Sequence, residues 1–183
     1  MTTLTIYADK APQQPEAVLT EFEQIRDALA AVGVELERWQ ASQPLSATAT
    51  QDEVIAAYRE AIDQLNQKFG FQSIDVVSMH PEHPQREAAR GKFLAEHTHA
   101  DFEIRFFVDG AGMFYIHHGG KVYMTLCTRG DLINLPANLT HWFDMGPTPN
   151  FKAIRLFTTA DGWIGNFTGS DIADHFPRYE ATV

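Results

Sequence analysis

The sequence predicts a mainly β fold in which an antiparallel sheet or barrel carries helices on its outside. Residues 1–90 combine two stretches of helical periodicity with short apolar runs. From about residue 97 the apolar runs become short, rich in β-branched and aromatic residues, and separated by glycines. A chain of 183 residues can bury one sizeable core. We therefore expect one domain over residues 1–183, with residues 1–90 packing on a barrel centred on residues 91–160.

Two amphipathic helices are predicted in the N-terminal half. In the first, apolar residues recur at spacings of three and four and line one face: Val18, Phe22, Ile25, Leu29 and Val32. The second begins with the capping-box pattern of Thr50 and Glu53 and ends at Gly70. Short strands are expected beside these helices, in the segments LTIYA, VELERWQ and SIDVVSM.

The C-terminal half has the rhythm of an antiparallel sheet. Its predicted strands are FEIRFFV, MFYIHH, VYMTLC, LINLP and FKAIRLFTT, with DGAG, GGK and TRGD as the breaks between them. The stretch His118-Gly119-Gly120-Lys121 is typical of a hairpin turn, because glycine adopts the positive φ that such a turn requires. The tail segment DIADHFPRY predicts one further short helix.

Composition excludes several classes of protein. The net charge of −10 repels phosphates, so nucleic acid is not an expected partner. The apolar runs are all too short for a membrane span, and the N-terminus lacks the pattern of a signal peptide, so we expect a cytoplasmic protein without a membrane partner. The acidic surface favours a monomer. Cys127 lies among apolar residues and is predicted to be a small buried side chain.

Three histidines and a glutamate are the strongest candidates for chemistry. His97 and His99 lie two positions apart, so they share one face if the segment is a strand. Glu103 reaches the same centre if the chain turns shortly after His99, and His141 follows a proline-bearing turn further along. Three imidazoles and one carboxylate suit a divalent transition metal such as Zn, Fe, Ni or Cu. On an octahedral ion they leave two positions for a chelating substrate, as a catalytic site requires.

A His-x-His pair taken alone is more often a surface or core feature than a metal site. The same applies to a single histidine, so none of the remaining histidines is expected to be a ligand. His117 and His118 lie at a turn and are expected to be solvated, His80 and His83 flank prolines in a loop, and His175 lies near the C-terminus.

The spacing of these residues resembles the two cupin motifs. The first motif requires a glycine, His-x-His, a glutamate and a second glycine, and the chain supplies Gly91, His97, His99, Glu103 and Gly110. The second motif is met at Gly130, Pro136 and His141. Asn138 stands in place of its middle glycine and Met145 in place of its final asparagine. Asparagine tolerates left-handed backbone best after glycine, so the first of these departures is mild.

Longer segments resemble one cupin family, the acireductone dioxygenases of methionine salvage. They are FLAEHTHADFEIRFFVDGAGMFYIH, DLINLPANLTHWFDMGPTPNFKAIRLF and GWIGNFTG, with likeness also in VELERWQA and VIAAYREAID. The resemblance implies a jelly-roll barrel, the double-stranded β-helix of cupins. It also implies one Fe²⁺ or Ni²⁺ ion held by His97, His99, Glu103 and His141, with the substrates acireductone (1,2-dihydroxy-3-keto-5-methylthiopentene) and O2.

The same resemblance implies that the metal selects the products. The iron form yields formate and 4-methylthio-2-oxobutanoate, the precursor of methionine, and the nickel form yields formate, carbon monoxide and 3-methylthiopropanoate.

Two further residues are predicted to act in catalysis. Arg105 shares a strand face with Glu103 and offers a planar fork of donors to an anionic substrate; the alternative is an arginine that only pairs with a carboxylate. Glu96, which precedes the first ligand, orients an imidazole, helps to capture the metal, or is an exposed charge at a strand end. Arg155 sits within an apolar strand and is expected to pair with an acidic residue.

Aromatic residues are predicted to enclose the methylthio tail of the substrate. The candidates are Phe93, Phe107, Phe143 and Trp163. Most aromatic residues of a barrel belong to its core, so each is a candidate for that role as well.

Other functions remain open at this point. One is a metal-binding cupin without turnover that serves as a sensor, although the chain shows no DNA-binding or partner domain beside the barrel. Others are a cupin dioxygenase for another enediol or a flavonol, which oxygen uptake with different substrates would separate, and a sugar isomerase, which would turn over without O2.

Overall fold

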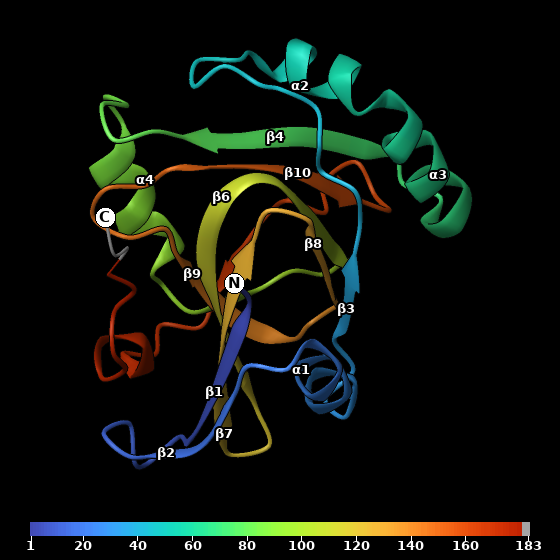
Figure 1. Ribbon diagram of the computed structural model, residues 1–183. Coiled ribbons are helices and arrows are strands. Elements are labelled where there is room, and N and C mark those ends of the chain that lie inside the picture. Colours follow the sequence, from blue (N-terminus) through green and yellow to red (C-terminus); the bar gives the residue numbers. More distant parts are fainter. Residues whose placement is uncertain (181–183) are drawn as a thin grey trace.

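A computed structural model, described here for residues 1–180, shows two antiparallel sheets that share one long strand (Figure 1). That strand is β6, Glu103–His118, which is bent and belongs to both sheets. Its second half pairs with β7, Lys121–Thr128, and with β9, Thr140–Asp144. Its first half pairs with β8, Asp131–Leu135, and with β10, Phe151–Phe157. The predicted mainly β jelly-roll architecture is confirmed.

The outer strands complete the two sheets. In the first sheet, β7 pairs with β1, Thr3–Ala8, which pairs in turn with β2, Pro15–Leu19. On the other side of β6, β9 pairs with β5, His97–Thr98, which pairs in turn with β11, Asn166–Phe167. In the second sheet, β10 pairs with β4, Ser73–Met79, and β8 pairs with β3, Glu35–Arg38. The N-terminal residues therefore supply strands to both sheets as well as helices that cover them.

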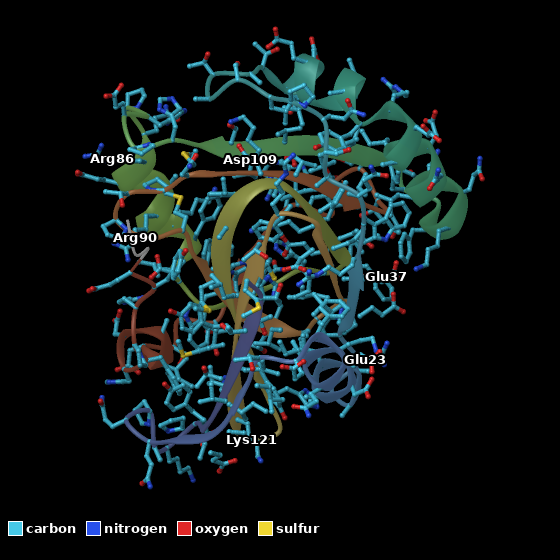
Figure 2. The ribbon with its side chains drawn as sticks, viewed as in Figure 1. Glu23, Glu37, Arg86, Arg90, Asp109 and Lys121 are labelled. Carbon is cyan, nitrogen blue, oxygen red and sulfur yellow. The ribbon has the colours of Figure 1, made fainter. Side chains whose placement is uncertain are left out.

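The helices lie outside the sheets. They are α1, Phe22–Ala30; α2, Gln51–Ala57; α3, Arg59–Phe69; α4, Arg86–Phe93; and a 3-10 turn, Ile172–Asp174. Figure 1 shows α2 and α3 on the outer side of β4, with α1 and α4 at separate edges of the molecule. Their charged side chains point outward, as Figure 2 shows for Glu23 and Arg86. Among the described helices, none has the length and hydropathy to cross a membrane.

Two apolar clusters hold the helices to the sheets. Ile25 and Leu29 of α1 are fully buried in a cluster with Phe107 and Phe143. The α2–α3 pair buries Val54, Ile62 and Leu65 in a second cluster, on the opposite side of β6, with Ile104 and Phe106. Because neighbouring β6 residues point to opposite faces, Phe106 and Phe107 enter different clusters.

The N-terminal helices differ from the prediction at two points. Val18 lies in β2 and is 61% exposed, so the first helix begins at Phe22 rather than at Val18. The second predicted helix is divided at Tyr58, whose backbone leaves the helical region while its ring packs edge-on against Phe106. The capping box at its start and the left-handed Gly70 at its end are confirmed.

Helix α4 was not predicted from the sequence, for a physical reason. It has only eight residues, none of them fully buried, and its apolar side consists of the partly buried Ala89 and Phe93, which is too short a pattern to predict a helix. It covers the barrel near β9 through Arg90, whose guanidinium donates two hydrogen bonds to the buried Asp144.

The predicted break at DGAG is wrong, because β6 runs through it. The pairing with β10 shifts register between Lys152 and Ala153, which leaves Val108 without a partner, and Gly110, two residues later, has a φ of +65°. This β-bulge bends β6 from one sheet into the other. The hairpin at Gly119 and Gly120 is confirmed, since both have positive φ.

Candidate metal centre

Three histidines meet where β5 lies beside β9. His97 opens β5 and stands directly opposite His141 of β9, and His99 follows β5. One ring nitrogen from each residue lies within 4.8 Å of the other two. The rings of His97 and His99 are 5.0 Å apart, which confirms that the two side chains share a face.

Each of the three imidazoles is oriented by a backbone carbonyl. The Nδ1 atom lies 2.7 Å from the Ala95 carbonyl in His97, 3.0 Å from the Ile164 carbonyl in His99, and 2.8 Å from the Leu139 carbonyl in His141. A nitrogen that faces a carbonyl must carry the proton, so Nε2 of each neutral ring keeps its lone pair. The three lone pairs are therefore available to a metal ion.

Glu103 adds a carboxylate to this group. The chain bends at Ala100 and Asp101 and enters β6 at Glu103, as the prediction required. The Glu103 carboxylate is buried, and its Oε2 lies 3.0 Å from Nε2 of His141 and 3.4 Å from Nε2 of His99. The carboxylate therefore lies beside the Nε2 atoms of two of the three imidazoles.

The charges of the site are shifted by burial and by one another. For Glu103, the cost of burial is outweighed by the charge of Arg105 and by the two histidines, so its pKa is well below the ordinary value. Burial and the neighbouring His141 lower the pKa of His97 to about 4. For His99, burial is outweighed by the hydrogen bond and charge of Glu103, so its pKa is raised. The site thus holds an ionised carboxylate beside at least one neutral imidazole at neutral pH.

Arg105 is buried two residues after Glu103 on the same face of β6. Its Nη2 atom forms an ion pair with Oε1 of Glu103. The guanidinium lies between two aromatic rings, 4.7 Å from the centre of Phe114 and 4.6 Å from that of Phe143. Its Nε and Nη1 atoms are buried and have no acceptor among the described residues. Such unpaired buried donors are costly, which is typical of a group that awaits a ligand.

A cavity of about 510 Å³ opens onto the three histidines and Arg105. Its wall is mainly apolar, a common property of small-molecule sites. The other lining residues come from α4, from β9 and β10, and from the segment after β10: Ala89, Lys92, Phe93, Phe143, Arg155, Trp163, Ile164, Gly165 and Phe167.

Three of the four predicted aromatic residues line the cavity, namely Phe93, Phe143 and Trp163. Phe107 does not. It is fully buried in the core behind Phe143, with their ring centres 6.3 Å apart, so its predicted place on the cavity wall is corrected. Arg155 also lines the cavity. Its guanidinium donates to both carboxylate oxygens of Asp75, at 2.8 and 2.6 Å, which confirms that Arg155 pairs with an acidic residue.

Lys92, Ile164, Gly165 and Phe167 were not singled out from the sequence. The last three belong to the segment GWIGNFTG, whose resemblance to the family could have indicated that they lie near the site.

Glu96 faces away from the three oriented imidazoles. Its carboxylate is buried, and it accepts hydrogen bonds from Nδ1 of His117 at 2.8 Å and from the hydroxyl of Thr168 at 2.7 Å. The alternative of an exposed charge is therefore wrong. The imidazole that Glu96 contacts is His117, which is only partly exposed, not solvated as predicted for it.

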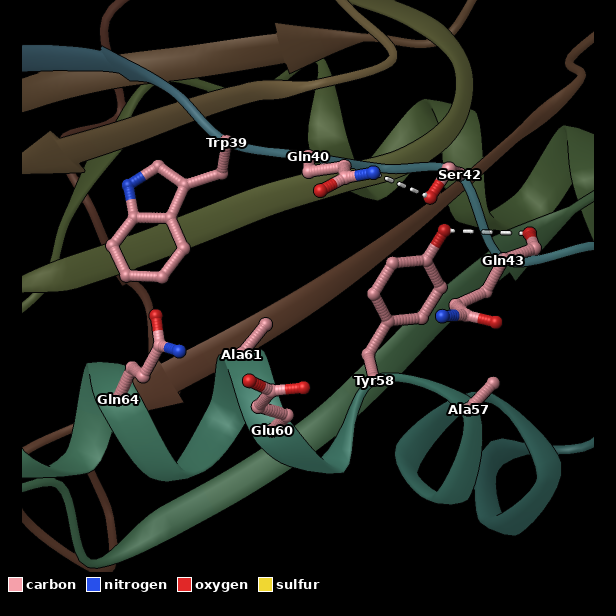
Figure 3. A pocket seen from close by; sticks show the side chains of 9 residues that line it. All are labelled: Trp39, Gln40, Ser42, Gln43, Ala57, Tyr58, Glu60, Ala61 and Gln64. Atoms are coloured by element: carbon pink, nitrogen blue, oxygen red, sulfur yellow. Dashed lines mark hydrogen bonds between the residues drawn. The ribbon is translucent and has the colours of Figure 1, made fainter.

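A second cavity of about 280 Å³ lies between the segment after β3 and the α2–α3 pair (Figure 3). Trp39, Tyr58, Glu60 and Gln64 are among its lining residues. It contains neither histidine nor cysteine, so it offers no comparable set of metal ligands.

Comparison with known proteins agrees with this site. The sequence model of the ARD/ARD' family matches residues 3–165. An acireductone dioxygenase of Alcanivorax borkumensis is 54% identical over 96% of this chain and 97% of its own length. Those of Methylococcus capsulatus and Aquifex aeolicus are each 51% identical, over 98% and 100% of this chain and 96% and 99% of their own lengths.

One solved structure is similar over most of the fold. It is an acireductone dioxygenase from Bacillus anthracis with a cadmium ion in its active centre. The two structures superpose with a TM-score of 0.80 at 26% sequence identity, covering 91% of this chain and 98% of the other.

Proposed function

The chain belongs to the ARD/ARD' family of acireductone dioxygenases, and we propose that its His97, His99, Glu103 and His141 hold the metal ion of that reaction. Members of this family are metal-dependent enzymes that use acireductone and O2. The main support for this proposal is that three oriented imidazoles line one apolar cavity and that a buried carboxylate contacts two of them.

The donor set fits a divalent transition metal. Imidazole nitrogen with one carboxylate oxygen suits iron and nickel, and the chain's single cysteine, Cys127, is buried in the core cluster. The second ring nitrogen of each histidine is already bonded to a carbonyl, as is usual for metal-ligating histidines. We propose that these four residues bind a single ion, which can be either Fe²⁺ or Ni²⁺.

When bound, such an ion supplies Lewis acidity to the enediol oxygens of the substrate. We propose that the Fe²⁺ form releases formate and 4-methylthio-2-oxobutanoate, and that the Ni²⁺ form releases formate, carbon monoxide and 3-methylthiopropanoate. Since the same four residues would bind either ion, the products would depend on which ion is available to the protein and not on a further residue of the chain.

Arg105 is proposed to bind the anionic oxygens of acireductone. Its Nε and Nη1 donors are free of acceptors among the described residues, and its position is fixed by two flanking rings and by Glu103. A guanidinium cannot lose its proton at neutral pH, so it stabilises the deprotonated substrate that reacts with O2. Binding an oxygen anion would also satisfy donors that are otherwise buried without partners.

The apolar wall is proposed to receive the methylthio tail. Phe93 of α4 packs edge-on against Phe143 of β9, with ring centres 6.1 Å apart, and Trp163 stands nearer the mouth with half of its surface exposed. Together these rings exclude water from the reacting carbons. Glu96 is proposed to act indirectly, because it holds Thr168 and His117 beside the strand that carries His97.

The test is reconstitution of metal-free protein with Fe²⁺ and, separately, with Ni²⁺. Each form receives acireductone in aerated buffer, substrate absorbance is followed, and the headspace is analysed for carbon monoxide. We expect substrate loss with both ions and carbon monoxide only with Ni²⁺. His141→Ala should lose metal and turnover together, whereas His118→Ala, on the exposed end of the β6–β7 hairpin, should keep both.

Two outcomes would contradict the proposal. Full metal content and full turnover in His141→Ala would reject the ligand assignment. Identical products from both metal forms would reject the role of the metal in product choice while leaving the ligands intact.

A further inference from the structure

The segment after β10 crosses the metal centre as a strap, which we define as residues 158–168. Its middle carries Trp163, Ile164 and Gly165, which line the cavity, and its end forms β11, which pairs with β5 beside His97. A Cβ atom on Gly165 would lie 3.4 Å from the His97 ring, so the strap rests directly on that ligand. The strap therefore forms part of both the cavity wall and the surroundings of the ligands.

His99 depends on this strap in a way that the other two histidines do not. The carbonyls that orient His97 and His141 belong to Ala95 and Leu139, each two residues earlier in the same segment. The carbonyl that orients His99 belongs to Ile164, which is 65 residues away along the chain. If the strap shifts, His99 loses the partner that fixes its ring while the other two histidines keep theirs.

Asp101 holds the beginning of the strap. Its carboxylate is buried and accepts hydrogen bonds from the hydroxyl of Thr158, from the backbone N–H of Thr159 at 2.7 Å, and from the hydroxyl of Thr159 at 3.1 Å. Gly162 packs against the same carboxylate so closely that a Cβ atom there would lie 2.5 Å from Oδ2. Both oxygens of Asp101 thus face the strap.

Glu96 holds the other end of the strap. It accepts from the Thr168 hydroxyl through its carboxylate, and its backbone carbonyl accepts from the Thr168 N–H at 3.1 Å. The two acidic residues flank the His97–His99 pair in the sequence, one on each side. The strap is therefore fastened at both ends to the segment that carries two of the ligands.

We propose that Asp101 is a positioning residue for the metal centre. It fastens the strap so that the Ile164 carbonyl keeps His99 oriented with Nε2 toward the metal and Trp163 remains on the cavity wall. This inference rests on the proposed function for its effect on turnover, but its effects on metal affinity and on strap mobility do not depend on which substrate is used.

The test compares Asp101→Asn with Asp131→Asn. Asp131 is a suitable control, because it is also buried and accepts from the backbone N–H and hydroxyl of Thr128, from the hydroxyl of Thr2 and from Arg38, outside the cavity lining. Each carboxylate oxygen of Asp101 accepts from a backbone N–H, that of Thr159 or that of Phe102, so in Asp101→Asn the amide NH2 must face one of these two donors. Ni²⁺ affinity is measured by competition with a chromogenic chelator, and backbone exchange of residues 158–168 by hydrogen–deuterium exchange.

We expect Asp101→Asn to weaken Ni²⁺ affinity about 10–100-fold, the usual effect of losing a residue that orients a ligand. Exchange of the strap should accelerate, and with Ni²⁺ at saturation KM should rise more than kcat falls, because the cavity wall is loosened. Asp131→Asn should keep the wild-type Ni²⁺ affinity and the wild-type exchange of the strap, even if its melting temperature falls as much as that of Asp101→Asn. Wild-type affinity and wild-type strap exchange in Asp101→Asn would overturn the inference.

Gly162→Ala provides a second test from the strap itself. It leaves the segment between His99 and Glu103 unchanged, yet its methyl group would push the strap away from the Asp101 carboxylate. We expect the same loss of Ni²⁺ affinity and the same faster exchange, so the inference stays testable if Asp101→Asn does not fold. Absence of turnover in the wild type would reject the proposed function alone, since affinity and exchange would still distinguish these variants.

Discussion

Arg105 shows how one side chain can be held rigidly and still be available to a ligand. Its guanidinium lies over the rings of Phe114 and Phe143, and one of its three nitrogens, Nη2, pairs with Glu103. The remaining buried donors, Nε and Nη1, lack acceptors among the described residues. In the role proposed for Arg105, an oxygen anion that enters the cavity would offset their desolvation, so the residue would favour the charged form of a substrate.

Replacing Arg105 by lysine tests whether the planar fork is required or the charge alone. Arg105→Lys keeps the positive charge but presents a single compact donor group, and it loses the fit between the two rings. We expect metal content to stay unchanged and kcat to fall about 100-fold, as for the loss of one donor to a developing anion. Metal analysis and steady-state kinetics measure both quantities.

The control for this change is Arg38→Lys. Arg38 also pairs with a buried carboxylate, that of Asp131, but it lies outside the cavity lining. We expect it to retain wild-type turnover. Unchanged kcat in Arg105→Lys would show that charge alone is sufficient, and the proposed hydrogen bonds to the substrate would then be wrong.

At the scale of the elements, the bulge in β6 decides where the two sheets meet. Gly110 has positive φ and approaches its neighbour so closely that a Cβ atom would lie 1.8 Å from the Asn150 carbonyl oxygen. Glu103 and Arg105 lie on one side of this bend, and the part of β6 that pairs with β9 and His141 lies on the other. The bend therefore brings the proposed ligands from the two halves of the barrel together.

Gly110→Ala should strongly destabilise the fold. The left-handed backbone costs a non-glycine residue about 1–2 kcal/mol, and the forced shift of the Asn150 backbone adds about 1–3 kcal/mol. The control is Gly119→Ala, which has a φ of +60° but nothing within 4 Å of its Cβ position, so only the backbone cost applies. Urea unfolding measures both, and equal losses in the two variants would contradict the steric argument.

The start of helix α2 predicts a dependence of stability on pH. The backbone N–H and the hydroxyl of Thr50 donate to Glu53 and lower its pKa below the ordinary value of 4.5. A carboxylate whose pKa is lowered by folding contributes stability above its unfolded pKa and loses it as the pH falls through the folded pKa.

Glu53→Gln should therefore lower the melting temperature at pH 7 and make little difference near pH 3. The effect at pH 7 should be no more than about 2–4 °C, because Glu53 is solvent-exposed. Thermal unfolding at the two pH values gives the comparison. Turnover should be unaffected, because no residue of α2 lines the cavity at the metal centre. A larger effect at pH 3 than at pH 7 would have the wrong sign for this explanation.

Across the whole molecule, the sequence predicted those features that residue type and spacing determine. The four proposed ligands followed from two motifs, and the left-handed backbone at Asn138, with φ of +63°, confirmed the role expected for that position. Helix α4 was missed because it is only eight residues long and its apolar side, Ala89 and Phe93, is only partly buried. Phe107 was misplaced because strand alternation gives the face of a residue but not its depth, and Phe143 closes the cavity above it.

The contact between His99 and the strap could not have been predicted from residue types. Its acceptor is the main-chain carbonyl of Ile164, and every residue has such a carbonyl. Only the folded chain shows that this carbonyl, rather than a side chain, orients the ligand.

The proposed ligands come from both sheets and from segments far apart in the chain, so metal binding should stabilise the whole fold. An ion that binds only the folded state, present at about 100 times its dissociation constant, adds about 2.7 kcal/mol to the free energy of unfolding. We expect Ni²⁺ to raise the melting temperature of metal-free protein by about 5–10 °C. Mg²⁺ should not, because it disfavours imidazole, whereas non-specific binding to a surface of net charge −10 would respond to both ions. Differential scanning calorimetry gives the comparison, and a Ni²⁺ effect that persists fully in His141→Ala would place the stabilising ion elsewhere.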